Sequence, residues 1–371
     1  MHKTWLSHAQ TNLPLKNENG KMRLIITEKP QLFDALAPRA AERWPGEEII
    51  MICSMPYILN VYSYPRGLAY NDYPLLGEPA YKKTESRFDD GSFTRAVLVT
   101  EGKAGDCYRM SFEQARKEML RADHLVFAGD WDHAGVWGME RMLELLAPER
   151  DGSLFEVAII NAGLDERSLR RILSDLRTPA DPRYQALKNA ALVKRYFDYN
   201  FNVNSLSILG NLYRSAADSN QPVLITKNMV QILIEAAKVG EILENGRSKD
   251  NSLCHWKGTG KYDPRDCDAY EWWLSGMGSA ASRPALLKQM TSLGMLEAKD
   301  DGKYPNGFAI TQFGRDFASR LHKDCTDPDL TFRLCHWMAK PLEEIKPSID
   351  AYLMGFFRKQ KRLQDADGKK K

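Results

Sequence analysis

The chain has 371 residues, of which 43% are hydrophobic and 27% are charged. This length suffices for two or three domains with complete apolar cores, and no apolar run approaches the ~18 residues of a membrane span. The formal net charge of +3 is too small to indicate a nucleic-acid partner by itself. The six cysteines show no C-x-x-C pair and no zinc-finger spacing, so we predict free thiols in a reducing, cytoplasmic compartment.

The first half of the chain alternates between strand and helix patterns. Residues 12–21 are polar and charged, and residues 1–21 are predicted to form a flexible leader before the first strand. Strands are then expected at 22–27, 48–54, 95–100, 124–128 and 154–160, with helices at 31–43, 111–121, 134–147 and 164–176. This alternation is typical of an α/β fold with a mostly parallel sheet covered by helices.

From about residue 185 onward the apolar spacing is helical. The segments with this spacing are 187–201, 229–243, 283–293, 313–321, 331–339 and 349–357. Residues 245–270 are polar and rich in Gly, Asp and Lys, which indicates a loop or linker. Asp301-Gly302 and Asn306-Gly307 bracket a hairpin, which would make the end of this region winged-helix-like.

Two acidic motifs follow predicted strands. Residues 124–139 read HLVFAGDWDHAGVWGM, so Asp130 and Asp132 lie between an apolar strand and a helix. Glu28 and Lys29 stand where the strand 22–27 ends. Parallel strands end at one edge of a sheet, where α/β folds place their sites. Closely spaced carboxylates repel each other, and a hard divalent cation such as Mg²⁺ relieves that repulsion.

Each of these residues also has a structural interpretation. Asp130 and Asp132 are good N-caps for the following helix, and Lys29 fits a solvated turn. His133 fits the start of a helix without further function, or alternatively a phosphate contact or a proton carrier near neutral pH. Trp131 fits a core position better than a base-stacking one.

Taken in order, the motifs resemble a known family. Glu28-Lys29-Pro30 and the segment Gly129–Val136 resemble the two acidic motifs of the TOPRIM domain. Gly276–Arg283 is similar to a G-I-G-T-x-A-T-R motif, and Ile310–Gly314 and Pro328–Thr331 follow in the family's order. This succession resembles the type IA DNA topoisomerases, in particular the topoisomerase III branch, over most of residues 22–362.

The resemblance implies a domain organisation. Residues 22–160 would be the TOPRIM domain, and 161–245 together with 274–362 the mainly helical region that cradles single-stranded DNA in the family. Residues 246–273 would be a linker in place of the family's gate arch, and 363–371 a basic tail.

The departures from the family pattern are equally informative. His133 replaces an arginine and Ala134 a third acid, and the junction motif, here Asn228–Leu233, lacks its arginine. The interval Glu241–Trp273 is too short for the arch, and it contains no Y-x-R-T-D nucleophile motif. Tyr64, in Ser-Tyr-Pro-Arg-Gly, precedes the Asp-x-Asp motif and is interpreted as a decoy. Tyr262 has the wrong sequence context.

These features predict a truncated topoisomerase-like protein without gate or tyrosine. The resemblance implies Mg²⁺ or Mn²⁺ binding by Glu28, Asp130 and Asp132, with Lys29 and His133 completing the catalytic set. Among the basic residues, Arg167, Arg170, Arg171 and Arg177 cluster on a predicted helix, and Arg283, Arg170 and Arg171 are the predicted DNA contacts.

Three functional classes follow from this interpretation. The first is Mg²⁺-dependent phosphodiester chemistry on single-stranded DNA, as a nuclease or incomplete topoisomerase. The second is non-catalytic single-stranded DNA binding. The third is an assembly subunit that reuses the fold, or half of a split enzyme whose protein partner supplies the tyrosine. In none of them do we expect a membrane partner, and we do not expect the isolated chain to relax supercoiled DNA.

Overall fold

The computed structural model describes residues 21–54, 61–82, 94–100, 103–105, 107–150, 155–160, 165–242, 261, 283–299, 307–327 and 329–368. Contacts between residues divide the chain into two compact units. The first comprises Met1–Asn60 and Lys83–Gln185, and the second comprises Val61–Lys82 and Ala186–Lys371. Among the described residues, no helix is both long and apolar enough to cross a membrane.

The first unit is built on an eight-stranded sheet with the order β4-β3-β2-β1-β6-β7-β8, in which β5 also pairs with β3. The central strands β2, β1, β6 and β7 are parallel neighbours, whereas β3, β4, β5 and β8 join the sheet antiparallel. The bounds are β1 (Met22–Thr27), β2 (Glu48–Ser54), β3 (Thr94–Thr100), β4 (Lys103–Ala104), β5 (Tyr108–Arg109), β6 (His124–Asp130), β7 (Glu156–Ile160) and β8 (Leu176–Arg177). Every residue of β1 is buried, which agrees with its apolar residues Met22 and Leu24–Ile26 and includes the ion-paired Arg23.

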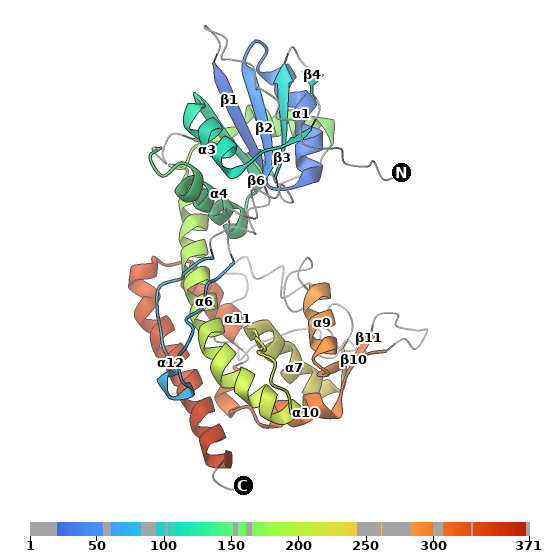
Figure 1. Cartoon of the computed structure of the whole chain (residues 1–371), viewed down its shortest axis with the longest axis vertical. Helices are drawn as coiled ribbons and strands as arrows, with labels where there is room; N and C mark the ends of the chain where they lie inside the picture. Colours follow the sequence, from blue (N-terminus) through green and yellow to red (C-terminus); the bar gives the residue numbers. More distant parts are fainter. Residues whose placement is uncertain are drawn as a thin grey trace. The chain divides into compact units, whose positions relative to one another are not determined.

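Helices cover both faces of this sheet. They are α1 (Pro30–Arg43), α3 (Phe112–Arg121), α4 (His133–Leu146) and α5 (Glu166–Ser174). Figure 1 shows α1 on one side of the strands and α3 and α4 on the other. The apolar residues of α1 and α5 form one core with β1, β2 and β6. Ser111, Asp132 and Asp165 cap α3, α4 and α5 by accepting backbone N–H groups, which fixes where each helix begins.

The second unit is mainly helical around a single large core. Its helices are α6 (Pro182–Ala217, whose first residues count with the first unit), α7 (Lys227–Val239), α9 (Arg283–Ser292), α10 (Gln312–Ser319), α11 (Leu330–Met338) and α12 (Leu342–Gly368). Three short strands, β9 (Glu241–Ile242), β10 (Leu296–Lys299) and β11 (Gly307–Ile310), form an antiparallel sheet in the order β10-β11-β9. The β10–β11 pair lies where the sequence predicts a hairpin, and the intervening residues 300–306 are outside the described ranges.

A segment from the first half of the chain, residues 61–82, is part of this helical unit. Two asparagines on α6, both fully buried, hold it. Asn204 accepts the N–H of Leu75 at 2.7 Å and donates to its carbonyl at 2.7 Å. Asn200 accepts the N–H of Gly77 at 2.8 Å and donates to its carbonyl at 2.9 Å. We call these four hydrogen bonds the asparagine clasp. They satisfy an extended backbone as a neighbouring strand would.

The contact pattern therefore divides the chain differently from the predicted boundaries. The first unit continues to Gln185 instead of residue 160, and it lacks residues 61–82. The predicted leader 1–21 and linker 246–273 lie outside the described residues, apart from Lys21 and Lys261. The predicted basic tail begins inside α12, which continues to Gly368, and residues 369–371 are not among those described.

The asparagine clasp makes the first testable prediction. Asn204→Ala should lower the free energy of unfolding by about 2 kcal/mol, because it removes two hydrogen bonds to the partly buried backbone of Leu75 and a fully buried amide. The measurement is chemical denaturation followed by circular dichroism. Asn202→Ala is the matched control, since Asn202 is only half-buried and makes one hydrogen bond, to the Tyr64 hydroxyl. Equal losses in the two variants would contradict a special role for the clasp.

Candidate functional site

The two acidic motifs meet because their strands are neighbours. β1 and β6 pair in parallel with Thr27 opposite Ala128, so Glu28 and Asp130 both lie at the carboxyl edge of the sheet. The N–H of Glu28 continues the ladder by donating to the Ala128 carbonyl at 3.0 Å. We call residues 130–132 the acidic turn.

Glu28 points toward the acidic turn. Its Oε2 accepts the backbone N–H of Asp130 at 2.9 Å. Burial raises the pKa of the Glu28 carboxyl, the hydrogen bond from Asp130 opposes this effect, and the charges of Asp130 and Asp132 raise the pKa further. Glu28 is therefore easier to protonate than an ordinary glutamate.

Lys29 forms an ion pair with the Asp130 carboxylate. The two side chains keep 50% and 39% of their surface exposed, so both groups remain within reach of a ligand. Burial by itself would lower the pKa of Lys29, but its hydrogen bond and charge interaction with Asp130 outweigh burial and the pKa is raised. Lys29 therefore carries a positive charge at neutral pH.

The other residues of the motif have structural partners. Asp132 is the N-cap of α4, and its Oδ1 accepts from Ala134 N and Gly135 N, each at 2.8 Å. The capping interpretation is thus correct for Asp132. His133 is the first residue of α4 and is half-buried. Trp131 is 7% exposed, which places it in the core.

A divalent cation fits this edge only in part. Within the described residues, no group of three or more His, Cys, Asp or Glu side chains is placed to hold a metal ion. Asp130 is paired with Lys29, Asp132 caps α4 and Glu28 accepts the Asp130 N–H. The predicted three-acid cation site stays a prediction. The donors are nevertheless hard oxygens, and Mg²⁺ commonly uses one or two carboxylates together with substrate phosphate oxygens.

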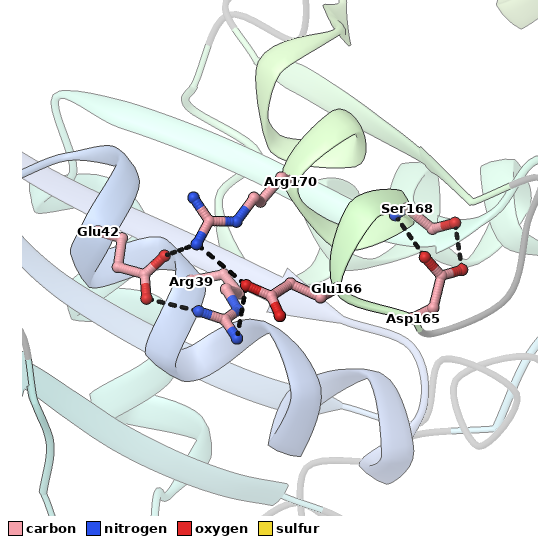
Figure 2. Close-up of polar contacts among 6 residues, drawn as sticks. All are labelled: Arg39, Glu42, Asp165, Glu166, Ser168 and Arg170. Carbon is pink, nitrogen blue, oxygen red and sulfur yellow. Dashed lines mark hydrogen bonds and ion pairs between the residues drawn. The ribbon is translucent and has the colours of Figure 1, made fainter.

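Arg170, a predicted DNA contact, belongs to an ion-pair network between α1 and α5 (Figure 2). Its guanidinium lies 3.4 Å from Glu42 and 3.1 Å from Glu166. Arg39 bridges the same two carboxylates, at 2.5 Å to Glu42 and 3.6 Å to Glu166. These four exposed or half-exposed side chains hold one another, so Arg170 is less available to a ligand than the sequence indicates.

The other predicted DNA contacts differ in accessibility. Arg171, like Arg167, is exposed on α5, on the side opposite the buried Leu169 and Ile172. Arg283, the first residue of α9 in the second unit, is only 6% exposed. Of the three predicted contacts, Arg170 and Arg171 are exposed and Arg283 is buried.

Of the two tyrosine candidates, Tyr64 lies among the described residues. Tyr64 belongs to the second unit, where its ring stacks 5.8 Å from that of Tyr199 and its hydroxyl accepts from Asn202 at 3.1 Å. Burial raises the pKa of the Tyr64 phenol, which disfavours the phenolate. Tyr262 lies outside the described residues.

One residue that the sequence did not single out is Lys227, at the start of α7. It is 6% exposed, and burial, followed by repulsion from Lys194, lowers its pKa to about 8. Thr226 is the N-cap of α7 and places Lys227 at the positive end of the helix dipole. The predicted junction motif begins at the next residue, and its Met229 is buried in the core where the family has an arginine.

Comparisons with known proteins do not assign the chain to a family. No protein-family model and no curated protein matches the chain. Its structure is similar to that of full-length topoisomerase I from Thermotoga maritima, with 12% sequence identity and a TM-score of 0.35. The similarity covers 58% of this chain and 30% of the topoisomerase, and an overlap of this extent does not establish a common fold.

Gly135 provides a test of how tightly the turn is packed. A Cβ at Gly135 would lie 2.3 Å from the Asp130 carbonyl oxygen and 3.2 Å from Glu28 Oε2. Gly135→Ala should therefore lower the free energy of unfolding by about 2 kcal/mol or more. Gly355→Ala in α12 is the control, because a Cβ there meets nothing within 4 Å, and it should be stabilising by about 0.5–1 kcal/mol. A neutral Gly135→Ala in thermal unfolding would contradict the close approach.

The raised pKa of Glu28 makes a prediction about pH. A carboxyl whose pKa is higher in the folded state than the ordinary 4.5 stabilises the fold below that value, and the contribution is lost as the pH rises through the folded-state pKa. At pH 7 the buried charge of Glu28 is therefore unfavourable. Glu28→Gln should raise the melting temperature at pH 7, and this advantage should shrink toward zero as the pH falls to 4.

The control for this measurement is Glu113→Gln, which changes an exposed carboxylate in the first turn of α3. It should lower stability slightly at pH 7, since it removes a favourable interaction with the helix dipole. A Glu28→Gln effect that is the same at pH 4 and pH 7 would show that the Glu28 charge is not the cause.

Proposed function

We propose that the chain binds single-stranded DNA and positions a phosphodiester at the acidic turn for Mg²⁺-assisted hydrolysis. The observation that supports this proposal is the convergence of Glu28, Lys29 and Asp130 at the carboxyl edge of the sheet through the β1–β6 pairing. A partly exposed ammonium beside partly exposed carboxylates offers both charges that a phosphate and its counter-cation require.

The residues have distinct roles in this proposal. Lys29 would contact a non-bridging phosphate oxygen and stabilise the charge that develops there. Glu28, with its raised pKa, would take a proton from the attacking water, whose oxygen forms the new P–O bond while the P–O bond to the departing sugar oxygen breaks. That sugar oxygen leaves with a proton from solvent. Mg²⁺, held by Asp130 and Asp132 with the phosphate, would supply neutralisation of the phosphate charge.

The DNA strand would be attracted by the exposed arginines of the first unit. Arg167 and Arg171 are separated by one helical turn and face solvent. Like charges at this spacing destabilise an isolated helix slightly, and a phosphate backbone relieves the repulsion. The helical unit, whose ordered motifs resemble the strand-cradling region of the type IA family, is the proposed second contact.

A non-catalytic binding function is the second candidate. It is favoured by the absence of a three-ligand metal group among the described residues, and by Ala134 in place of a further acid. In that case the acidic turn serves to hold α4, with Asp132 as its cap. The two candidates share DNA binding and differ in metal-dependent cleavage.

A single experiment distinguishes these functions. Circular single-stranded DNA is incubated with the chain and Mn²⁺, and the products are separated on denaturing gels. The proposed function predicts nicks that require Mn²⁺ and are lost in Asp130→Asn, with no protein attached to the DNA ends. Binding to labelled oligo(dT) should be tighter than to duplex and should weaken as salt increases. The non-catalytic candidate predicts the same binding without nicks.

Asp123→Asn is the matched control for Asp130→Asn, because Asp123 lies at the opposite end of the same strand and accepts the Met22 N–H. It should leave cleavage intact. A DNA-linked protein that disappears in Tyr64→Phe would restore a topoisomerase mechanism and contradict the proposal. Equal affinity for duplex and single strands, or no dependence on salt, would contradict it as well.

A further inference from the structure

The central residue of the acidic turn, Trp131, is buried and anchors the turn. Trp131, between the two aspartates, is 7% exposed and packs its ring 6.1 Å from that of Tyr184. The guanidinium of Arg183 lies 6.0 Å from the same indole. A turn whose middle side chain is buried cannot shift without moving that side chain, so the packing around Trp131 determines where Asp130 and Asp132 lie.

Tyr184 is held in place in turn. Its side chain is completely buried and forms an edge-on contact with Phe155, with ring centroids 5.8 Å apart. Its hydroxyl donates to Glu140 Oε1 at 2.8 Å. Burial and the neighbouring Glu140 both raise the pKa of Tyr184, so the phenol stays protonated and remains a donor.

These contacts connect the acidic turn to α4. Glu140 lies on α4, and α4 begins at the acidic turn with Asp132 as its N-cap. The acidic turn is thus connected to α4 in two ways. Asp132 caps the helix directly, and Trp131 contacts Tyr184, which donates a hydrogen bond to Glu140 on α4. Loss of the phenol hydroxyl would remove the hydrogen bond from Tyr184 to Glu140. The Tyr184 ring, which packs against Trp131, would then be held less firmly.

We infer that Tyr184 and Glu140 are positioning residues for the acidic turn, which set the spacing of Asp130 and Asp132 for a divalent cation through the buried Trp131. The inference about the cation rests on the proposed function. The inference that Tyr184 supports the turn does not rest on the proposed function, because it follows from the packing alone. Outer partners of metal ligands commonly change metal affinity by about 10–100-fold when they are removed, although they never touch the ion.

Two measurements on the full chain test this inference. The first is Mn²⁺ affinity, from the loss of the free-ion signal in electron paramagnetic resonance. Tyr184→Phe should weaken Mn²⁺ binding about tenfold, whereas Glu140→Gln, which keeps an acceptor for the phenol, should stay near wild type. The second is hydrogen exchange of the Asp130, Ala134 and Gly135 amides, which are bonded to Glu28 and Asp132. These amides should exchange faster in Tyr184→Phe.

Tyr196→Phe is the matched control, because the buried Tyr196 also donates to a carboxylate, Asp350, at 2.6 Å, but belongs to the second unit. It should lower the melting temperature without changing either measurement. Wild-type affinity and exchange in Tyr184→Phe, or equal changes in Tyr196→Phe, would overturn the inference. If the wild-type chain binds no Mn²⁺, the metal part of the proposed function and the cation part of this inference both fail. The exchange rates still decide whether Tyr184 supports the turn.

Discussion

The parallel pairing of β1 with β6 is the constraint on which the rest of the first unit depends. It brings together two motifs that are about a hundred residues apart in sequence, and it aligns them so that Glu28 reaches the backbone of Asp130. Parallel strands need covering helices on both faces, and α1 and α4 both start at the edge that carries the acids. The strand pairing that forms the sheet therefore also brings the candidate site residues together.

Each carboxylate at this edge has a partner within the protein. Lys29 compensates Asp130, two amide groups compensate Asp132, and Glu28 combines an amide contact with a raised pKa. A cation at Asp130 would have to compete with the ion pair between Lys29 and Asp130.

The central strands and the first helices could be predicted from sequence because apolar runs and caps are local signals. Two features could not. Asp130 and Asp132 are the same residue type, and only the backbone geometry shows that Asp132 is the cap. Helix α6 extends from Pro182 to Ala217, well beyond the predicted segment 187–201. The prediction ended too early because buried polar residues, such as Asn204 and Ser205, interrupt the apolar spacing after residue 201. Asn200 and Asn204 are buried on account of the segment 61–82, and no local pattern reveals that contact.

The asparagine clasp also affects the order in which the chain can fold. Residues 61–82 leave the ribosome long before α6 is made, so the backbone groups of Leu75 and Gly77 cannot form the clasp until Asn200 and Asn204 have been synthesised. Contacts between such distant residues form late, because the loop between them must close first. During synthesis the segment 61–82 is thus available before the helix that holds it. The helical core is completed only when the C-terminal half of the protein has emerged.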